Sequence, residues 1–351
     1  MVCRIHIGHH FFGAGNLGDD LMLAGFLCEI QRQEVDLQLT CCIPHPRMSM
    51  QLRFPQIEWL PYESPKREQA ISRSDVWLGL GDTPFQTVLG DWMLDHLLEE
   101  AAWCELHKKP MYYLAVGGDA SDLASHPKVR LVARRAERIW TRDSVSAALL
   151  SRCGAPARVE SGADLAHLCL ATINFPRALP NEAGLVLNFE QREQASSTEL
   201  STLVRTLSEA YRLRWLAQEV RPLRGSELSL HGELSADAQR AAPLVLPDYA
   251  GAPSVSALLQ AWGSPSGLLT SRYHAALIGA WAGWRTLVFP RSEKVRAVAE
   301  ELDLCTVPSF SDAATVEALL GRAGTVPRGK LWKSHGLART ACTEFFASIG
   351  A

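Results

Sequence analysis

This sequence contains an arginine and a histidine separated by one residue. The first could supply a positive charge and the second a proton. Arg272 and His274 occur in Ser271-Arg272-Tyr273-His274-Ala275, between a short apolar segment and an apolar segment with small residues. The arginine offers a planar, permanently charged fork for a phosphate or carboxylate. The histidine can deliver a proton near neutral pH. Because a lone histidine at the start of an apolar helix is more often a hydrogen-bonded core residue, both interpretations stay open from spacing alone.

A glycine-rich segment near the N-terminus is a second candidate. Gly13, Gly15 and Gly18 lie between an expected strand and an expected helix. Glycines let the backbone approach a ligand closely, and the N–H groups and dipole of a following helix favour an anion or a polar ligand. The spacing is not that of a dinucleotide fingerprint, so NAD is excluded. The alternative is a tight turn in which Asp19 caps the helix.

Polar residues also follow three other expected strands. Arg142 could reach a ligand, but pairing with Asp143 or Asp164 to hold a helix start is the better interpretation of its spacing. The loop Gly79–Gln86 is another glycine-containing strand end. Lys294 follows a further strand, where a cation could meet a phosphate, although a lone lysine there is usually a solvated helix start.

Metal and disulfide sites have little support. His6, His9 and His10 are close in sequence, but adjacent histidines cannot easily share a metal and no metal-binding spacing follows. The nine cysteines form no C-x-x-C pair, and many lie in apolar segments. We therefore expect no metal and free, mostly buried thiols in a reducing compartment.

Composition narrows the class of protein. A length of 351 residues suggests two domains, and an apolar fraction of 47% is ample for two hydrophobic cores. With 35 basic and 38 acidic residues the formal net charge is −3, which argues against nucleic acid as a partner. We see neither a signal peptide nor an apolar stretch long enough for a transmembrane segment, so we expect a cytoplasmic protein.

Strand-like and helix-like segments alternate along the chain, which predicts an α/β fold with parallel sheets. A Pro- and Asn-rich break at Thr172–Ala183 suggests a linker. We therefore expect an N-terminal Rossmann-like domain over residues 1–171, a C-terminal one over 184–330, and a last helix over 331–351. The polar stretch Arg221–Glu233 is predicted to be a loop.

Five segments occur in the order found in the polysaccharide pyruvyl transferase family, which the chain resembles over about residues 3–305. They are Gly15-Asn16-Leu17-Gly18-Asp19-Asp20, Arg142-Asp143-Ser144-Val145-Ser146, a short strand ending at Asp164, Ser271-Arg272-Tyr273-His274-Ala275, and Lys294-Val295. The resemblance implies two Rossmann-like domains facing a cleft, similar to the B-type glycosyltransferases, with the last helix packing back on the first domain.

The resemblance also implies an activity. Family members use phosphoenolpyruvate to place a pyruvate ketal on a sugar, in a bacterial surface polysaccharide or its lipid-linked precursor. The implied partners are therefore phosphoenolpyruvate and a sugar or lipid-linked saccharide acceptor. Peripheral membrane contact through the acceptor and a homo-oligomer both stay open. No cofactor is implied, because cations can neutralise the charge that develops.

Roles for individual residues follow from the resemblance. His274 would be the general acid that protonates the enol carbon, with Arg272 beside it in the catalytic pair. Arg272 would also bind the donor, together with Lys294, Arg142 and Ser271. The remaining substrate-binding residues would be Gly15, Asn16, Gly18, Asp19, Gly81, Asp82 and Asp164.

Asp82 departs from the glycine run of many relatives and would place negative charge near a dianionic donor.

Two alternatives to pyruvyl transfer remain. A glycosyltransferase with a nucleotide-sugar donor could use the same cleft, but it would want a ribose-binding carboxylate in the second domain, and no glutamate pattern for one is evident. A non-catalytic sugar- or anion-binding protein is the third interpretation, and the presence of both Arg272 and His274 argues against it.

Overall fold

The computed structural model describes residues 2–8, 12–44, 47–87, 90–119, 123–154, 158–176, 184–190, 196–221, 225–308 and 313–351. The chain forms two compact units. Unit 1 consists of Met1–Gly13, Asp19–Ala171 and Trp332–Ala351. Unit 2 consists of Ala14–Gly18 and Thr172–Leu331. The first βα loop and the last helix are thus divided between the two units.

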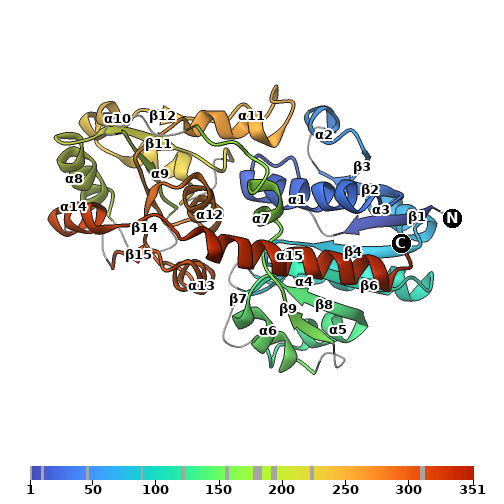
Figure 1. Ribbon diagram of the computed structural model, residues 1–351. Coiled ribbons are helices and arrows are strands. Elements are labelled where there is room, and N and C mark those ends of the chain that lie inside the picture. The colour runs from blue at the N-terminus through green and yellow to red at the C-terminus, as the bar shows by residue number, and fades with distance from the viewer. Residues whose placement is uncertain are drawn as a thin grey trace. The chain divides into compact units, whose positions relative to one another are not determined.

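Unit 1 contains a parallel sheet that has seven strands in the described residues, in the order β3-β2-β1-β4-β6-β8-β9 (Figure 1). These strands are β1 (Cys3–Gly8), β2 (Leu37–Ile43), β3 (Ile57–Pro61), β4 (Val76–Leu80), β6 (Met111–Val116), β8 (Ala136–Thr141) and β9 (Val159–Ser161). A separate small pair joins β5 (Phe85–Gln86) to β7 (Gly118–Asp119). The helices are α1 (Leu17–Gln33), α2 (Arg47–Arg53), α3 (Ser64–Arg73), α4 (Trp92–Leu106), α5 (Pro127–Arg135), α6 (Ser144–Ser151), α7 (Ala166–Leu170) and most of α15 (Arg328–Ser348).

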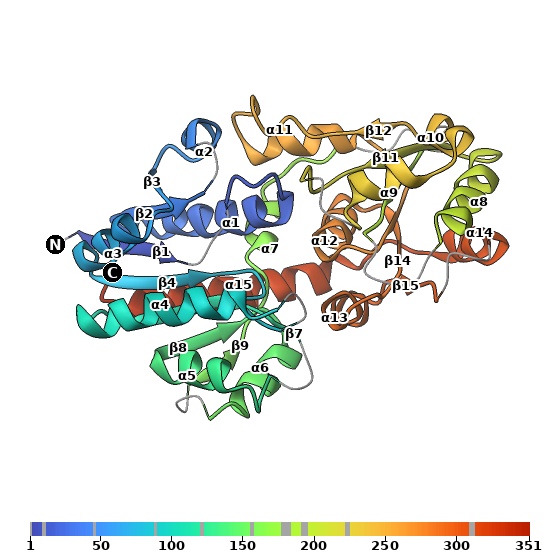
Figure 2. The same ribbon diagram turned by 180° about the vertical axis from the view of Figure 1, so that it is seen from behind.

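Neighbouring residues of β6 show how both faces of this sheet are covered. Side chains alternate along a strand, so Tyr113 contacts Trp77 on one face, in the core that α3, α4 and α5 complete. Tyr112 points to the other face and contacts Phe345 of α15. A strand buried on both faces reads as a continuous apolar run, as β6 does. Figure 2 shows α15, in red, running along unit 1.

Unit 2 has the same strand arrangement as the first six strands of the unit 1 sheet. Its described strands form a six-stranded parallel sheet in the order β12-β11-β10-β13-β14-β15. The strands are β10 (Gly184–Asn188), β11 (Arg212–Leu216), β12 (Leu244–Val245), β13 (Gly267–Thr270), β14 (Arg285–Val288) and β15 (Cys305–Thr306). The helices are α8 (Ser197–Ser208), α9 (Glu227–Glu233), α10 (Ala236–Ala241), α11 (Val255–Leu259), a 3-10 turn at Gln260–Trp262, α12 (Tyr273–Ala282), α13 (Glu293–Leu302) and α14 (Ala313–Arg322). Two parallel-sheet α/β domains confirm the predicted fold class.

The prediction of a loop over Arg221–Glu233 was wrong at its C-terminal end, where α9 begins at Glu227. Ser226 caps this helix, because its hydroxyl accepts a hydrogen bond from the Ser229 amide. Glu227 and Leu230 both face inward, and because the fully buried Glu227 is charged, the apolar pattern of this short helix is incomplete. In unit 1, α2, β3 and α3 were also missed, because they are short, at seven, five and ten residues.

None of the nine cysteines, all of which lie in the described part of the chain, forms a disulfide bond. No helix in the ranges given above is both long and apolar enough to cross a membrane. His9, His10 and much of the predicted linker, residues 177–183, lie outside the described residues.

The buried His6 on β1 makes the stability of unit 1 depend on pH. The imidazole is buried and Nδ1 lies 3.1 Å from the Thr40 hydroxyl. Burial, reinforced by the charge of Arg67, lowers the pKa of His6 to about 3. Unfolding restores an ordinary pKa near 6.5, so stability is complete above that pH and falls as the pH drops toward 3. We expect wild type to lose about 2 kcal/mol more than His6→Gln in free energy of unfolding between pH 7 and 5. Urea unfolding at the two pH values measures this, and equal losses would contradict it.

Candidate functional site

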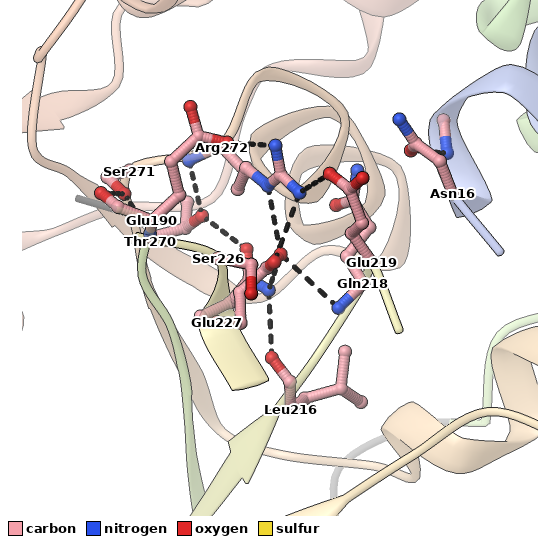
Figure 3. A network of polar contacts seen from close by, with 12 residues as sticks. Asn16, Glu190, Leu216, Gln218, Glu219, Ser226, Glu227, Thr270, Ser271 and Arg272 are labelled. Atoms are coloured by element: carbon pink, nitrogen blue, oxygen red, sulfur yellow. Dashed lines mark hydrogen bonds and ion pairs between the residues drawn. The ribbon is translucent and has the colours of Figure 1, made fainter. Parts of the chain in front are cut away.

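In unit 2, charged side chains lie just after the carboxyl ends of three neighbouring strands. Strand order reverses between β10 and β13, and ligands bind at such switch points in open α/β sheets. Glu190 follows β10, Glu219 follows β11 and Arg272 follows β13. Figure 3 shows these residues converging. The topology therefore brings together residues that lie up to 82 positions apart in the chain.

Arg272 is held by three carboxylates. Its Nε and Nη2 donate to the two oxygens of Glu227 at 2.9 and 3.0 Å, in a bidentate pair. Nη2 also donates to Glu219 at 2.8 Å, and Nη1 contacts Glu190. Every nitrogen of the guanidinium is thus engaged by a carboxylate in this structure.

The cluster carries more negative than positive charge. Glu227 is fully buried, while the side chains of Glu219, Arg272 and Glu190 are 8%, 12% and 16% exposed. Burial lowers the pKa of Arg272, but the three carboxylates outweigh it and raise that pKa well above its usual range. Burial raises the pKa of Glu227, against the opposing effect of Arg272. Even with Arg221, which pairs with Glu219, the cluster contains three carboxyl groups and two guanidinium groups.

Hydroxyl groups fix the geometry of the strand ends. The Ser271 hydroxyl accepts a hydrogen bond from the Glu190 amide at 2.8 Å and donates to the Glu190 carbonyl at 3.0 Å. Thr270 donates to the side chain of Asn188 at 2.9 Å and accepts from the Arg272 amide at 2.9 Å. Ser271, predicted to bind the donor, therefore positions the backbone of Glu190.

The glycine-rich loop near the N-terminus belongs to this same site. Asn16 pairs with Glu219 in an antiparallel bridge, and the Val220 amide donates to the Gly15 carbonyl at 3.0 Å. The Asn16 side chain accepts a hydrogen bond from the Gly18 amide at 3.0 Å. The glycine-rich loop is thus adjacent, within unit 2, to the strand end that carries Glu219.

Gly18 and His274 are in close contact. His274 lies in the first turn of α12 and is half-buried. A Cβ atom built on Gly18 would lie 2.0 Å from the His274 Nδ1. The absence of a side chain at position 18 is therefore what makes room for the imidazole.

Gly18→Ala should disturb this contact. We expect the variant to lose about 1–3 kcal/mol in free energy of unfolding, because the added methyl group overlaps the ring. We also expect slower turnover. Urea unfolding and a rate assay check both effects. Gly336→Ala on α15 is the control, since no heavy atom lies within 4 Å of its added Cβ; equal behaviour of the two variants would show that the ring moves aside freely.

Other predicted residues lie in unit 1. The guanidinium of Arg142 is buried over Gly117, donates to the Thr83 hydroxyl at 3.0 Å and lies 3.4 Å from Asp143. Asp164 is fully buried and accepts from the Ala166 amide at 2.8 Å. These contacts hold the polypeptide after β8 and β9.

Asp19, Gly81 and Asp82 also lie in unit 1, whereas Lys294 lies in unit 2. Gly81 and Asp82 follow β4 with positive φ values of 66° and 59°, and Asp19 lies in the first turn of α1. Lys294 is half-buried in the first turn of α13, in unit 2. No group of three or more His, Cys, Asp or Glu side chains in the described part of the chain could hold a metal ion.

Glu190, Glu219 and Glu227 were not among the predicted site residues. No glutamate pattern for a ribose-binding carboxylate was evident in the sequence, and the structure places these three carboxylates, from two strand ends and a helix start, around Arg272. The strand ends were the available signal for Glu190 and Glu219. Ser226, as a helix cap, was the signal for Glu227.

Two Rossmann-like domains define the fold class, which is the architecture of the B-type glycosyltransferases. Over 99% of both chains, the structure is similar to UDP-GlcNAc 2-epimerase from Neisseria meningitidis bound to UDP-GlcNAc, with a TM-score of 0.66 and 12% identity. It is also similar to Anabaena Alr3699/HepE in complex with UDP, over 99% of both chains, with a TM-score of 0.59 and 9% identity. Identities this low show the fold alone. A comparison of the sequence with curated proteins gives no match.

The family model for polysaccharide pyruvyl transferase matches residues 16–293. The chain belongs to this family, as its motifs suggested, and is therefore a transferase. The matched segment begins at Asn16 and contains Glu190, Glu219, Glu227, Arg272 and His274.

Proposed function

We propose that this protein transfers the pyruvyl group of phosphoenolpyruvate to two hydroxyls of a sugar, forming a pyruvate ketal. The observation that supports this most directly is the position of His274, next to Arg272 and against Gly18 at the switch point of unit 2. Family membership supplies the reaction class. The acceptor we propose is a sugar of a polysaccharide or of its lipid-linked precursor.

His274 would begin the reaction by donating a proton to the methylene carbon of phosphoenolpyruvate. The adjacent carbon then becomes electrophilic, and the first sugar hydroxyl adds to it and loses its proton. The second hydroxyl replaces phosphate at the same carbon and loses its proton too. One of these two protons restores His274 and the other leaves with phosphate, so the products are the ketal and inorganic phosphate.

Arg272 is the first cation we propose for the donor, and its contacts limit how it can act. An anion can bind this guanidinium only if it displaces one of the carboxylates. Lys294 is the further cation that we propose from unit 2, with Asn16, Gly15 and Gly18 lining the substrate site near His274. Arg142 is already engaged by Thr83 and Asp143.

Ligand-dependent thermal stability tests this proposal. A ligand that binds only the native state raises the melting temperature by mass action. We expect phosphoenolpyruvate to raise it and UDP, UDP-glucose and UDP-GlcNAc to leave it unchanged at the same concentration. A shift with a uridine nucleotide and none with phosphoenolpyruvate would overturn the proposal.

The second candidate is a nucleotide-sugar transferase, and the carboxylate cluster is the observation that favours it. Glu190 is partly exposed and Glu219 lies close to it at a switch point, where carboxylates can accept hydrogen bonds from ribose hydroxyls. The same thermal measurement separates the two candidates. Arg272→Ala is unsuitable for this purpose, because it would leave three carboxylates facing one another and so destabilise the site.

A further inference from the structure

We infer that Glu190 is an internal anion that occupies Arg272 before the donor binds, and that an anionic group of the donor replaces it. Glu190 would then determine how tightly the donor is held. The inference rests on the proposed function and adds to it a residue that the family motifs do not contain.

The three carboxylates around Arg272 differ in their burial and in their contacts. Glu227 is fully buried and binds both Nε and Nη2. Glu219 binds Nη2 and also pairs with Arg221. These two carboxylates hold one side of the guanidinium as part of the interior of unit 2.

Glu190 faces the remaining nitrogen. Among the described residues, Nη1 of Arg272 contacts the Glu190 carboxylate. This carboxylate is the most exposed of the three, at 16%. Nη1 is therefore the one guanidinium nitrogen that a ligand could reach by displacing a partly solvated group instead of a buried one.

Charge decides whether the donor joins Glu190 or replaces it. The cluster already contains more carboxylates than guanidinium groups, so a phosphate or carboxylate added beside Glu190 would meet net repulsion. Replacement keeps one anion on Nη1, while Glu190 gains water. Ser271 fixes the backbone of Glu190 through two hydrogen bonds, so in this exchange the side chain rotates while the backbone keeps its place.

Glu190→Gln tests the inference, because it removes the competing charge and keeps the shape. Arg272 retains Glu219 and Glu227 in this variant, so the fold should persist, and a melting curve verifies that it does. We expect the Kd of phosphoenolpyruvate, measured by isothermal titration calorimetry at fixed ionic strength, to fall roughly tenfold or more. Glu190→Ala should change the Kd in the same direction and serves if the glutamine variant does not fold.

Asp237→Asn is the matched control. It makes the same change in net charge in the same unit, from a side chain that is 71% exposed and paired with Arg240, and it should leave the Kd unchanged. If Glu190→Gln binds phosphoenolpyruvate no more tightly than wild type, the inference is overturned while the proposed function stands. If neither wild type nor any variant binds it, the proposed function fails and the inference fails with it.

Discussion

Replacing His274 with glutamine should slow turnover by roughly 10²–10⁴-fold, the usual contribution of a general acid. Glutamine is similar in size and can form hydrogen bonds, but it cannot deliver a proton near neutral pH. The side chain would still fill the space over Gly18, so the melting temperature should remain close to that of wild type. Release of phosphate from saturating phosphoenolpyruvate in the presence of acceptor measures the rate.

His231→Gln is the control for this experiment. His231 lies in the same unit, on α9, and its Nε2 is 3.0 Å from the Ala242 carbonyl. This variant should keep its activity. A His274→Gln enzyme whose turnover lies within a few-fold of wild type would show that another group supplies the proton.

Glu227→Ala should produce the largest loss of stability in unit 2, about 3–5 kcal/mol in free energy of unfolding. Besides Arg272, the Glu227 carboxylate accepts from the Asn188 side chain at 3.2 Å and from the Gln218 amide at 3.3 Å. Its removal leaves these buried donors without their acceptor, and such groups are costly to leave unsatisfied. Urea unfolding at pH 7 measures the loss.

Glu233→Ala provides the comparison from the other end of α9. Its carboxylate accepts from the Ser229 hydroxyl near the surface, and surface substitutions of this kind change stability by about 0.5 kcal/mol or less. Similar losses in the two variants would mean that the buried network around Glu227 adds nothing beyond a surface contact.

The fold class could be predicted because strands and helices in this chain are largely local patterns. Buried strands such as β6 are continuous apolar runs, and alternation with helices is enough to indicate parallel sheets. The elements that escaped detection are short, and in α9 one of the two inward-facing residues is the charged Glu227. A buried glutamate stabilised by a distant arginine leaves no trace in hydrophobic periodicity.

The site was only half accessible to sequence analysis, for a related reason. Arg272 and His274 could be selected because they follow a strand and share a short motif. Glu190 and Glu219 acquire their significance only through pairing with Arg272 across 82 and 53 residues. The contact between Gly18 and His274 is longer still in sequence, and motif order alone could not place these two residues against each other.

The division of α15 between the units has a consequence for how the protein is made. Trp332–Ala351 belongs to unit 1, where Phe345 and Phe346 contact Phe26, and Glu344 binds both Arg138 and the indole of Trp140. Domains usually fold in the order in which they leave the ribosome. Here most of unit 1 emerges before unit 2, but residues 332–351 of unit 1 emerge after it. The nascent unit 1 therefore exposes Phe26, Tyr112 and Trp140 until α15 has been synthesised.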